Sequence, residues 1–558
     1  MTTWYLGLAT SGHDPALALV DAAGQVVYAE ATERYVQDKR AWGIAPDHAP
    51  HLERVFRAAG VDPARDEVVI AASWKSLKNE RPATQTNMRL PDAAWLAVLQ
   101  SRAMQDAGAS LLRLRMTDAP PQARRYEHHL CHAVNAAYSA PFDDAACLVI
   151  DGEGDVGATS LYRMTGRRMK RVFRSWGPGS LGMYYAWLTE ACGFDWRLGE
   201  EWKVMGMAAF GTPDPELVRW LRGLLDVNRG RMRLPPGLTL ADADARVAPH
   251  ARRPDEPIMK AAELAASGQQ AYAQMVDEIL TEGLDAPGGK LILSGGCALN
   301  SSYNGTICGR LGFDDVFVPS APADDGNAIG AALLAWMEDH PGSPIPRGDG
   351  SPFLGARPDR RVIDKLGAKG GFARVTDLAG RAAKVVADKL AEGRIVGVMR
   401  GRAEFGPRAL GHRSILADPR PAEMKDRINA QVKGREAYRP FAPVIPTARV
   451  PEWFDGATRT SPYMSFTLPW KPQVRERVPA VVHADGTGRL QTVDAATNPW
   501  MTDLIAAFEA RTGVPVVLNT SFNIMGKPIV HSVEDAVAVL MTTGLDAVLL
   551  EDVLVEAG

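Results

Sequence analysis

Residues 4–34 read WYLGLATSGHDPALALVDAAGQVVYAEATER, and residues 146–175 read ACLVIDGEGDVGATSLYRMTGRRMKRVFRS. Each stretch contains three apolar runs of strand length, separated first by a polar turn with glycine and then by a second turn. Apolar alternation between such turns predicts strands. Because both stretches follow the same scheme and both precede helical segments, they predict a duplicated α/β fold with a cleft between its halves.

The fold class that this repeat favours is the actin-like one. Actin-like nucleotide-binding folds are built from two such halves, whose polar turns face each other across the nucleotide. Many other α/β proteins contain similar hairpins, so the repeat alone leaves them open. Residues 290–300 predict a further strand and turn, and residues 315–337 predict a strand, a loop and an apolar helix.

The domain organisation follows from length and from one linker. A chain of 558 residues is too long for one core, so two or three domains are expected. The stretch PGSPIPRGDGSPFLGARP (341–358) holds five prolines and four glycines and has little to bury. We therefore predict a domain over residues 1–345, a linker over 346–358 and a second domain over 359–558. Residues 75–125 match no motif and are interpreted as an acceptor-specific insertion or a helical lid.

Composition excludes several classes of protein. The formal net charge is −3, whereas a general nucleic-acid binder is usually basic. The five cysteines are scattered without a CxxC pair, which argues against a disulfide framework or zinc ribbon and for a reducing cytoplasm. The N-terminus lacks a basic, then apolar, signal region, and no segment approaches the roughly 18 apolar residues of a membrane span. We predict a cytoplasmic protein that binds neither nucleic acid nor membrane.

A metal site is indicated by YEHHLCHAVNAAY (126–138). On a helix, His128 and His132 point to one face, where two imidazoles can share a cation, while His129 lies off that face. Two carboxylates can complete the set: Asp151 at a strand end, and Asp324 or Asp325 in a loop before a helix. Two histidines and two carboxylates suit Fe(II), Mn(II) or Zn(II). The alternatives are two partly exposed helical histidines and ordinary turn or cap aspartates.

Two further stretches are candidates for a nucleotide site. SGGCALN (294–300) follows a strand, and Gly295-Gly296 could let a purine or ribose approach the backbone, although a tight turn is the commoner explanation. EEWKVMGMAAFG (200–211) makes Lys203 a candidate catalytic residue, the alternative being a solvated lysine. A P-loop is excluded because GxxxxGK[ST] does not occur.

An anion site is indicated by clustered cations in the latter third of the chain. Residues 400–439 hold ten arginines and lysines against five acidic residues. RAEFGPRALGHRS (402–414) places Arg408 on a turn between glycines, and KGREAYRPFAP (433–443) adds further cations. Guanidinium groups bind phosphate with paired hydrogen bonds, so the loops together favour a phosphate-type site. Surface salt bridges are the alternative for each single arginine.

The residues proposed around this anion fall into two groups. The cations beside Arg408 are Lys433, Arg435 and Arg439. The side chains that could complete the shell are those of Asn519, Thr520, Ser521 and Asn523. The acidic residues with which surface salt bridges would form are Glu404, Asp418 and Glu436.

Several long motifs resemble one enzyme family. EFGPRALGHRSILADPR, REAYRPFAP, HADGTGRLQTV (483–493) and NTSFNIMGKPIV (519–530) resemble the C-terminal domain of the NodU/CmcH/TobZ-type O-carbamoyltransferases. SGHD, HHLCH, KVMGMAAFG, SGGCALN and DDGNAIGAAL resemble the N-terminal domain of the same family. The resemblance runs from residue 5 to about residue 550 and is interrupted mainly around 75–125.

This resemblance implies a fold and a reaction. The N-terminal domain would be actin-like (ASKHA), similar to the tRNA threonylcarbamoyl-transferase proteins, and the C-terminal domain would be YrdC-like α/β. The C-terminal domain would convert carbamoyl phosphate and ATP to carbamoyl adenylate. The N-terminal domain would transfer the carbamoyl group to a hydroxyl of a small acceptor, such as an antibiotic or another specialised metabolite. The implied cofactors are ATP with Mg2+ and a divalent metal, Fe(II), in the N-terminal domain.

The resemblance also implies roles for individual residues. The carbamoyl phosphate ligands would be Arg408, Lys433, Arg439, Asn519 and Ser521. The metal ligands would be His128, His132, Asp151 and Asp324, with Asp325 as the competing choice for the last. The adenosine contacts would be Gly295, Gly296 and Asn300. His13 would be the base on the acceptor hydroxyl, because an imidazole titrates near neutral pH. The alternative for His13 is a turn-capping residue.

Four other functions compete with this one. An actin-like sugar kinase leaves the arginine loops unexplained, and a plain metal hydrolase leaves Arg408 and Lys433 without a purpose. A tRNA-modifying protein would share both domain types, but the net charge of −3 argues against it. A non-catalytic scaffold would not need all the candidate polar residues. No residue selects the acceptor, and the oligomeric state is open.

Overall fold

The computed structural model describes most of the chain. The residues described are 2–62, 65–75, 93–117, 122–155, 157–175, 179–233, 235–284, 288–367, 372, 374–458 and 460–557. The region 75–125, expected to be an insertion or lid, lies partly outside them. Its described part includes two helices, α3 (Ala93–Asp106) and α4 (Ala109–Arg113).

The chain folds into two compact units. The N-terminal unit comprises Met1–Glu33, Arg40–Asn300 and Ile307–Gly350. The C-terminal unit comprises Ser351–Gly558 together with the short segments Arg34–Lys39 and Ser301–Thr306.

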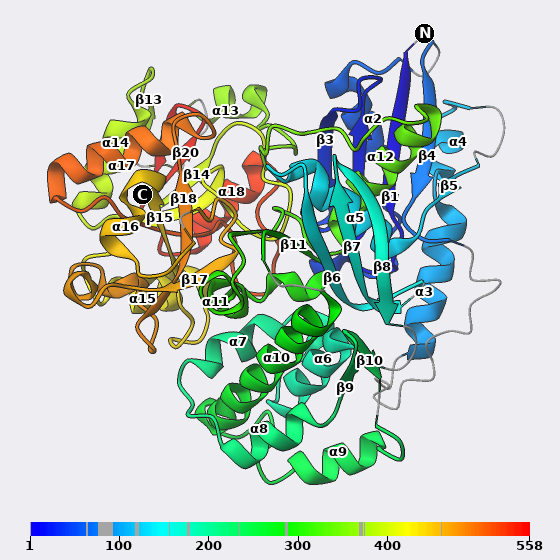
Figure 1. Ribbon diagram of the computed structural model, residues 1–558. Helices are drawn as coiled ribbons and strands as arrows, with labels where there is room; N and C mark the ends of the chain where they lie inside the picture. Colours follow the sequence, from blue (N-terminus) through cyan, green and yellow to red (C-terminus); the bar gives the residue numbers. More distant parts are fainter. Residues whose placement is uncertain are drawn as a thin grey trace. The chain divides into compact units, whose positions relative to one another are not determined.

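The N-terminal unit contains two five-stranded sheets in the described residues (Figure 1). The first has the order β3-β2-β1-β4-β5 and the second the order β8-β7-β6-β11-β12. The strands of the first are β1 (Thr3–Ala9), β2 (Ala16–Val20), β3 (Val26–Ala31), β4 (Glu67–Ala72) and β5 (Arg124–Arg125). Those of the second are β6 (Ala145–Gly154), β7 (Gly157–Thr165), β8 (Arg168–Ser175), β11 (Lys290–Ser294) and β12 (Asp315–Phe317).

The two sheets share one pattern of strand directions. In each, the opening strand pairs antiparallel with the second, which pairs antiparallel with the third. The opening strand also pairs in parallel with the fourth, and the fourth in parallel with the fifth. The six strands predicted in residues 4–34 and 146–175 are therefore confirmed, with the two predicted hairpins in each stretch.

Helices α5 (His128–Ser139) and α12 (Asn327–Asp339) pack between the two sheets of the N-terminal unit. α12 packs on β1, β2 and β4, α5 packs on β6 and β11, and the two helices pack on each other. At these contacts the main chains of neighbouring elements approach each other closely. A methyl group on Gly7 of β1 would collide with the main-chain oxygen of Ala328, and one on Gly330 of α12 with that of Cys131. The close packing fixes where α5 and the start of α12 present their polar side chains.

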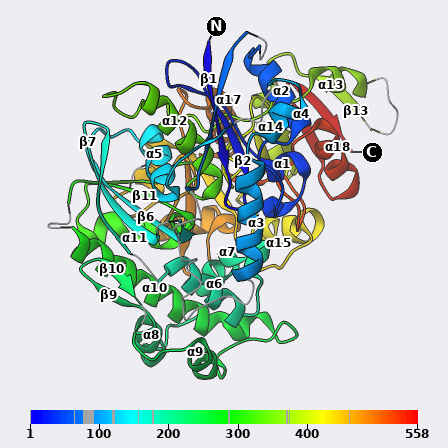
Figure 2. The same cartoon turned by 90° about the vertical axis from the view of Figure 1, so that its right-hand side faces the viewer.

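A helical region completes the N-terminal unit. Its helix α10 packs against α6, α7 and α8, and the four lie together in both views (Figure 1 and Figure 2). The elements are α6 (Leu181–Ala191), α7 (Glu201–Ala208), α8 (Pro215–Arg222), α9 (Leu240–Val247), α10 (Ala262–Gly283), β9 (Asp226–Asn228) and β10 (Arg231–Arg233). Helix α2 (Ala49–Ala59) buries Leu52, Val55 and Phe56 in the core beside the first sheet. Helices α1 (Thr32–Val36) and α11 (Ser301–Leu311) contribute residues to both units.

The C-terminal unit is built on one nine-stranded mixed sheet, with the order β13-β21-β20-β14-β15-β19-β16-β18-β17. Its apolar residues and those of the covering helices form a single large core that includes Trp453, Phe508 and Val548. The strands are β13 (Arg374–Asp377), β14 (Val396–Met399), β15 (Arg413–Ala417), β16 (Ala442–Pro446), β17 (Phe466–Pro469), β18 (Thr487–Val493), β19 (Val517–Ser521), β20 (Ala547–Leu550) and β21 (Val553–Glu556). The helices are α13 (Arg360–Leu366), α14 (Ala382–Ala391), α15 (Met424–Arg427), α16 (Val450–Trp453), α17 (Pro499–Thr512) and α18 (Val533–Thr542).

The sequence predicts two helices in this unit. One covers 421–433, with Pro421 early and Glu423 in its first turn, and the other is SVEDAVAVLMTT (532–543), with Ser532 as N-cap and Asp535 at the capping-box position. The capping box at the start of α18 is confirmed, because Ser532 and Asp535 exchange side-chain-to-backbone hydrogen bonds. The helix predicted over 421–433 is confirmed only in part. It begins at Met424, and its last turns, Ile428–Lys433, wind as a π-helix. The wider winding ends where Arg435 donates to the main-chain and side-chain oxygens of Asn429.

No helix in the described part of the chain is both long and apolar enough to cross a membrane.

Candidate functional site

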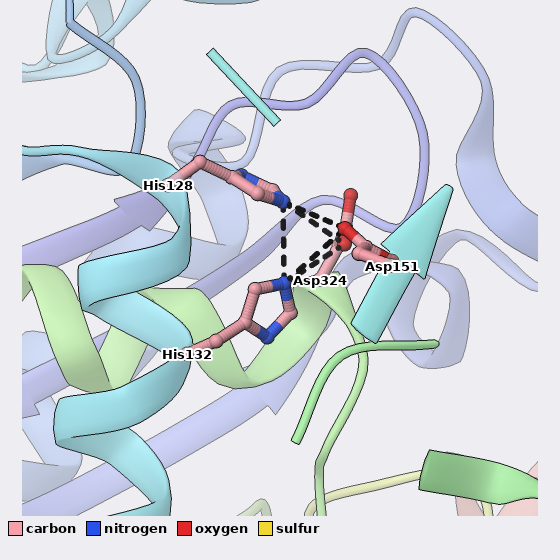
Figure 3. A group of neighbouring side chains, drawn as sticks. All are labelled: His128, His132, Asp151 and Asp324. Atoms are coloured by element: carbon pink, nitrogen blue, oxygen red, sulfur yellow. Dashed lines mark hydrogen bonds and ion pairs between the residues drawn. The ribbon is translucent and has the colours of Figure 1, made fainter. Parts of the chain in front are cut away.

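Four side chains of the N-terminal unit converge at one point. His128 and His132 extend from successive turns of α5, Asp151 from β6, and Asp324 from the short turn before α12 (Figure 3). The Nε2 atom of His128 lies 3.1 Å from Asp151 Oδ2 and 3.4 Å from Asp324 Oδ1. The Nε2 atom of His132 lies 3.5 and 3.4 Å from the same two oxygens. We call these four residues the metal cluster.

The donor set of the metal cluster fits a divalent cation. One ligand atom from each residue lies within 4.8 Å of all the others, and all four residues are buried. The Nε2 atoms of the two histidines face each other at 3.2 Å. Burial lowers the pKa of His128, but the carboxylates of Asp324 and Asp151 outweigh this and raise that pKa to about 10. The cluster therefore holds positive charge strongly, and its imidazole and carboxylate donors suit a transition metal.

The two neighbouring residues that could have joined this cluster point elsewhere. His129 directs Nδ1 to Ser160 Oγ at 2.9 Å, off the face shared by the two cluster histidines, as the spacing predicts. Asp325 accepts a hydrogen bond from the Gly326 N–H instead. Burial, with Asp14 and Glu33 nearby, raises the pKa of Asp325 to about 7. Of the two adjacent aspartates, the structure thus brings Asp324 to the histidines.

The loop after β11 lies against the metal cluster. The N–H of Gly296 donates to Asp151 Oδ1 over 3.1 Å. Gly295 has a φ of +88°, and a side chain there would collide with the carbonyl of Ile150. Asn300 lies further along the loop and exchanges two hydrogen bonds of 3.0 Å with the side chain of Gln269. Two of the three predicted nucleotide contacts are therefore adjacent to the cluster.

His13 also reaches the metal cluster. Its Nε2 lies 3.7 Å from Asp324 Oδ2, and its Nδ1 lies 2.9 Å from Asp14 Oδ2. Arg40 donates to the same oxygen of Asp14 through Nε and a terminal nitrogen. The first polar turn thus places an imidazole of fixed orientation beside the cluster. Lys203 on α7, the other candidate catalytic residue, forms a 2.6 Å ion pair with Glu200, the residue before that helix.

In the C-terminal unit, a carboxylate fixes the loop between β14 and β15. The Oε1 atom of buried Glu404 accepts hydrogen bonds from the backbone N–H groups of Leu410, His412 and Arg413, at 2.7, 2.8 and 3.1 Å. Two arginines also hold this loop in place, through hydrogen bonds to main-chain oxygens. Arg413 is fully buried and donates to the main-chain oxygens of four residues, and Arg402 donates to two. Glu404 is thus part of the scaffold rather than a salt-bridge partner of Arg408.

Arg408 behaves differently from these two arginines. Its guanidinium makes no hydrogen bond and no ion pair with the described residues. Burial lowers its pKa to about 10. The loop is therefore built by Glu404, Arg402 and Arg413, and it presents Arg408 without a protein partner.

The loop lies on one face of the nine-stranded sheet. Asn519 on β19 donates to the main-chain oxygen of Ala409 at 3.1 Å and to Gln491 Oε1 at 2.6 Å. Gln491 on β18 donates to the main-chain oxygen of Leu410 at 2.9 Å. These bonds place residues 409–410 over the side chains of Asn519 and Gln491. The buried Oδ1 atom of Asn519 has no hydrogen-bond partner in the described structure.

Lys433 is a buried cation held by neutral oxygens. Its side chain is 2% exposed and donates to Ser521 Oγ at 3.2 Å and to Asn523 Oδ1 at 2.7 Å, as well as to main-chain oxygens of both residues. Burial first, and then the charges of Arg435 and Arg439, lower its pKa well below the ordinary value of 10.5. Lys433 therefore carries a charge that its surroundings disfavour.

The other two cations of this loop have partners of different kinds. Arg439 forms a 3.1 Å ion pair with Glu436, which is the salt bridge expected as the alternative for this arginine. Arg435 donates to Asn429 Oδ1, and burial with the charge of Arg439 lowers its pKa to about 9.

Comparison with known proteins identifies the family. Residues 5–333 match the family model described as Carbamoyltransferase N-terminus, and residues 387–557 match Carbamoyltransferase C-terminus. The chain belongs to the carbamoyltransferase family. It is an enzyme of that class, and its predicted resemblance is confirmed.

Two curated relatives of the carbamoyltransferase are nodulation proteins. It is 36% identical over 563 residues to nodulation protein NolNO of Sinorhizobium fredii, which covers 98% of this chain and 79% of that protein. It is 38% identical over 447 residues to nodulation protein NolO of Bradyrhizobium diazoefficiens, covering 77% and 78%. Among solved structures, (R)-2-hydroxyglutaryl-CoA dehydratase component A of Acidaminococcus fermentans matches at 11% identity and a TM-score of 0.35, over 61% of this chain and all of that one. A match this weak carries no argument.

One cation of the carbamoyltransferase was missed by sequence reasoning. Arg489 lies on β18 two residues before Gln491, so both side chains point to the same face of the sheet. Its Nε is buried without a hydrogen-bond partner, and burial with the charges of Arg408 and Arg435 lowers its pKa far below the ordinary range. The motif HADGTGRLQTV contains the signal, because Thr487, Arg489 and Gln491 alternate with apolar residues or glycine.

The predicted anion ligands of the carbamoyltransferase thus lie around one part of the C-terminal unit. Asn519 and Ser521 alternate on one face of β19, with Lys433 bonded to Ser521 and the Arg408 loop bonded to Asn519. We call the cations of this region the cationic face: Arg408, Lys433, Arg435, Arg439 and Arg489.

Proposed function

We propose that this carbamoyltransferase uses carbamoyl phosphate and ATP to carbamoylate a hydroxyl group of a small acceptor. In the C-terminal unit, water and carbamoyl phosphate give phosphate and carbamate, and a carbamate oxygen then attacks the α-phosphorus of ATP. Pyrophosphate leaves, and carbamoyl adenylate remains. In the N-terminal unit, the acceptor hydroxyl attacks the carbamoyl carbon, the C–O bond to the nucleotide breaks, and AMP leaves.

The observation that carries this proposal is the cationic face. Burial and mutual repulsion lower the pKa values of Lys433, Arg435 and Arg489, and Arg408 and Arg489 show no carboxylate partner in the described residues. Buried charges are ordinarily paired, so uncompensated ones indicate a missing anion. A phosphate dianion with several oxygens matches such a set. We assign carbamoyl phosphate to Arg408, Lys433, Arg439, Asn519 and Ser521, and add Arg489.

The metal cluster is proposed to hold the divalent metal of the transfer step. His128, His132, Asp151 and Asp324 would be its ligands, and we propose Fe(II), with Mg2+ accompanying ATP. When bound, the metal would neutralise negative charge on the nucleotide phosphate. Gly295 and Gly296 fit this placement because their loop touches Asp151, and we assign them, with Asn300, to the adenosine.

His13 is proposed as the base on the acceptor hydroxyl. Its Nδ1 is engaged by Asp14, which leaves Nε2 on the side of the metal cluster. An alcohol must lose its proton as it attacks a carbonyl carbon, and a nearby imidazole can accept that proton. Lys203 is assigned to the same step, from its position on α7. The acceptor is proposed to be an antibiotic or other specialised metabolite.

The folds of the two units are consistent with this division of labour. The equal strand order and directions of the two sheets support an actin-like, duplicated N-terminal domain. The single mixed sheet with an anion loop supports a YrdC-like C-terminal domain. Both assignments are part of the proposal.

The experiment measures pyrophosphate release by the full chain supplied with carbamoyl phosphate, ATP, Mg2+ and Fe(II). We expect release that needs both substrates, and a fall of about 100-fold or more in Arg408→Met and Arg489→Met. Arg394→Gln is the matched control, because Arg394 is exposed and pairs with Asp546. Activity that persists unchanged in both site variants would reject the proposal.

A further inference from the structure

The side chain of His483 lies on the side of the nine-stranded sheet to which Arg489, a member of the cationic face, also projects. Strand β18 alternates, so Thr487, Arg489 and Gln491 project to one side. The hydroxyl of Thr487 contacts His483 Nδ1 at 3.1 Å, which brings the imidazole to that side. Gln491 in turn contacts Asn519. One row of side chains therefore runs from His483 past Arg489 to the proposed carbamoyl phosphate ligands.

The hydrogen bonds of His483 determine which nitrogen carries its proton. The hydroxyl of Thr487 donates its single hydrogen to Asp485 Oδ1 at 2.7 Å. Its oxygen can then only accept from His483, so the proton lies on Nδ1 and the lone pair on Nε2. The backbone N–H of Thr487 also donates to Asp485, at 3.0 Å, which holds the turn in place. The hydrogen bonds from His483 to Thr487 and from Thr487 to Asp485 therefore make Nε2 of His483 a hydrogen-bond acceptor.

This acceptor has no hydrogen-bond partner in the described part of the chain. Nε2 is buried and makes no hydrogen bond with the described residues. Burial, together with the charges of Arg489 and Lys425, lowers the pKa of His483 to about 4, against the opposing charge of Asp485. The neutral imidazole therefore offers an acceptor beside the cations Arg489 and Lys425, with Asp485 already engaged by Thr487. It would be satisfied by an N–H donor.

We propose that His483 Nε2 accepts a hydrogen bond from the amide nitrogen of carbamoyl phosphate and thereby selects a carbamoyl over an acyl donor. This inference rests on the proposed function. A buried acceptor left without a partner penalises a substrate that lacks the matching N–H. Acetyl phosphate has the same shape but carries a methyl group in place of the amide nitrogen. The cations bind its phosphate equally well, so they cannot make this distinction.

Two N–H donors are available among the proposed substrates, and the structure favours the amide. The amide nitrogen is separated from the phosphorus of carbamoyl phosphate by one oxygen and one carbon. A phosphate beside Arg489 therefore carries the amide with it toward the neighbouring imidazole. The amino group of adenine is separated from every phosphate of ATP by the whole nucleoside. The experiment tests both donors.

The experiment compares the kcat/KM of pyrophosphate release for carbamoyl phosphate and for acetyl phosphate, with ATP saturating. We expect wild type to prefer carbamoyl phosphate, and His483→Leu to lose about tenfold or more of that preference. The loss should fall on carbamoyl phosphate and leave acetyl phosphate unchanged. His483→Gln, which restores an acceptor, should recover part of the preference. A second arm replaces ATP by purine riboside triphosphate, which lacks the adenine amino group.

Thr487 provides the matched pair. Thr487→Val removes the anchor of the Nδ1 proton and should weaken the preference, whereas Thr487→Ser keeps the hydroxyl and should resemble wild type. These variants decide the question if His483→Leu does not fold. An unchanged preference in His483→Leu and Thr487→Val would overturn the inference, as would a loss seen only between ATP and its analogue. Wild type that releases no pyrophosphate from carbamoyl phosphate and ATP would instead overturn the proposed function itself.

Discussion

The metal cluster is buried and the cationic face is buried or half-buried, but their charges are arranged in opposite ways. In the metal cluster, two carboxylates and two imidazoles point at one another within 4.8 Å. In the cationic face, guanidinium and ammonium groups lower one another's pKa values, and among the described residues only Arg439 forms an ion pair with a carboxylate. The first group accommodates a cation and the second an anion.

The difference shows how charge type becomes informative only with its surroundings. Arg413 and Arg408 are five residues apart in one loop, yet Arg413 donates to backbone oxygens and Arg408 has no partner among the described residues. Asp324 and Asp325 are adjacent, yet only Asp324 faces the histidines. Each pair therefore offers a binding variant and a matched control. Replacing Arg408 or Asp324 should impair binding, whereas replacing Arg413 should impair folding and replacing Asp325 should do neither.

The largest effect is expected at Arg413. Arg413→Met removes donors to main-chain oxygens, including those of Arg400 and Ala356, inside a fully buried site. We expect the free energy of unfolding of the C-terminal unit to fall by about 3–5 kcal/mol, because the carbonyls lose their partners. Urea unfolding followed by fluorescence measures it.

Arg408→Met is the control for this prediction. Removing a half-buried charge that has no partner among the described residues should leave the unfolding free energy unchanged or raise it slightly, while substrate turnover is lost. If Arg408→Met destabilised the unit as much as Arg413→Met, the distinction between a scaffold arginine and a binding arginine would be wrong.

The next effect is expected at the metal cluster. Asp324→Asn removes one of two carboxylates, so we expect metal affinity to fall by more than about 100-fold. Asp325→Asn should retain the metal, because its side chain faces the Gly326 N–H. Inductively coupled plasma mass spectrometry of the dialysed variants, reconstituted with Fe(II), gives the metal content directly. Equal retention in both variants would exclude Asp324 as a ligand.

Much of the fold could be predicted from the sequence, because it depends on local patterns. The hairpins of residues 4–34 and 146–175 show the strand alternation and the turns between them, and Ser532 with Asp535 marks the start of α18. The π-helix at Ile428–Lys433 could not be predicted, since it depends on Arg435 returning to Asn429 after the helix ends. The nine-stranded order is a property of pairing between distant segments, which no local pattern contains.

The candidate site likewise contains residues whose roles follow from local sequence spacing and residues whose roles do not. His128 and His132 are one helical turn apart, so their shared face follows from spacing alone. The separate roles of Arg402, Arg408 and Arg413 do not follow from spacing, because all three are cations in a glycine-containing loop. The alternation around Arg489 marks a polar face of β18 in the sequence, but only the contact between Gln491 and Asn519 shows that this face meets the loop.

The smallest effect concerns protons at Lys433. In the folded state its pKa is well below the ordinary value of 10.5, so just below that value the native state binds fewer protons than the unfolded state. The contribution of Lys433 to stability therefore rises with pH through this window.

A bound dianion would return the pKa of Lys433 toward the ordinary value. Binding of inorganic phosphate at about pH 9.5 should then take up as much as one proton, which isothermal titration calorimetry detects as a difference between two buffers of unequal ionisation enthalpy. Lys527→Met alters an exposed lysine and should keep this uptake, whereas Lys433→Met should abolish it. Phosphate binding without any buffer dependence in wild type would mean that Lys433 does not meet the anion.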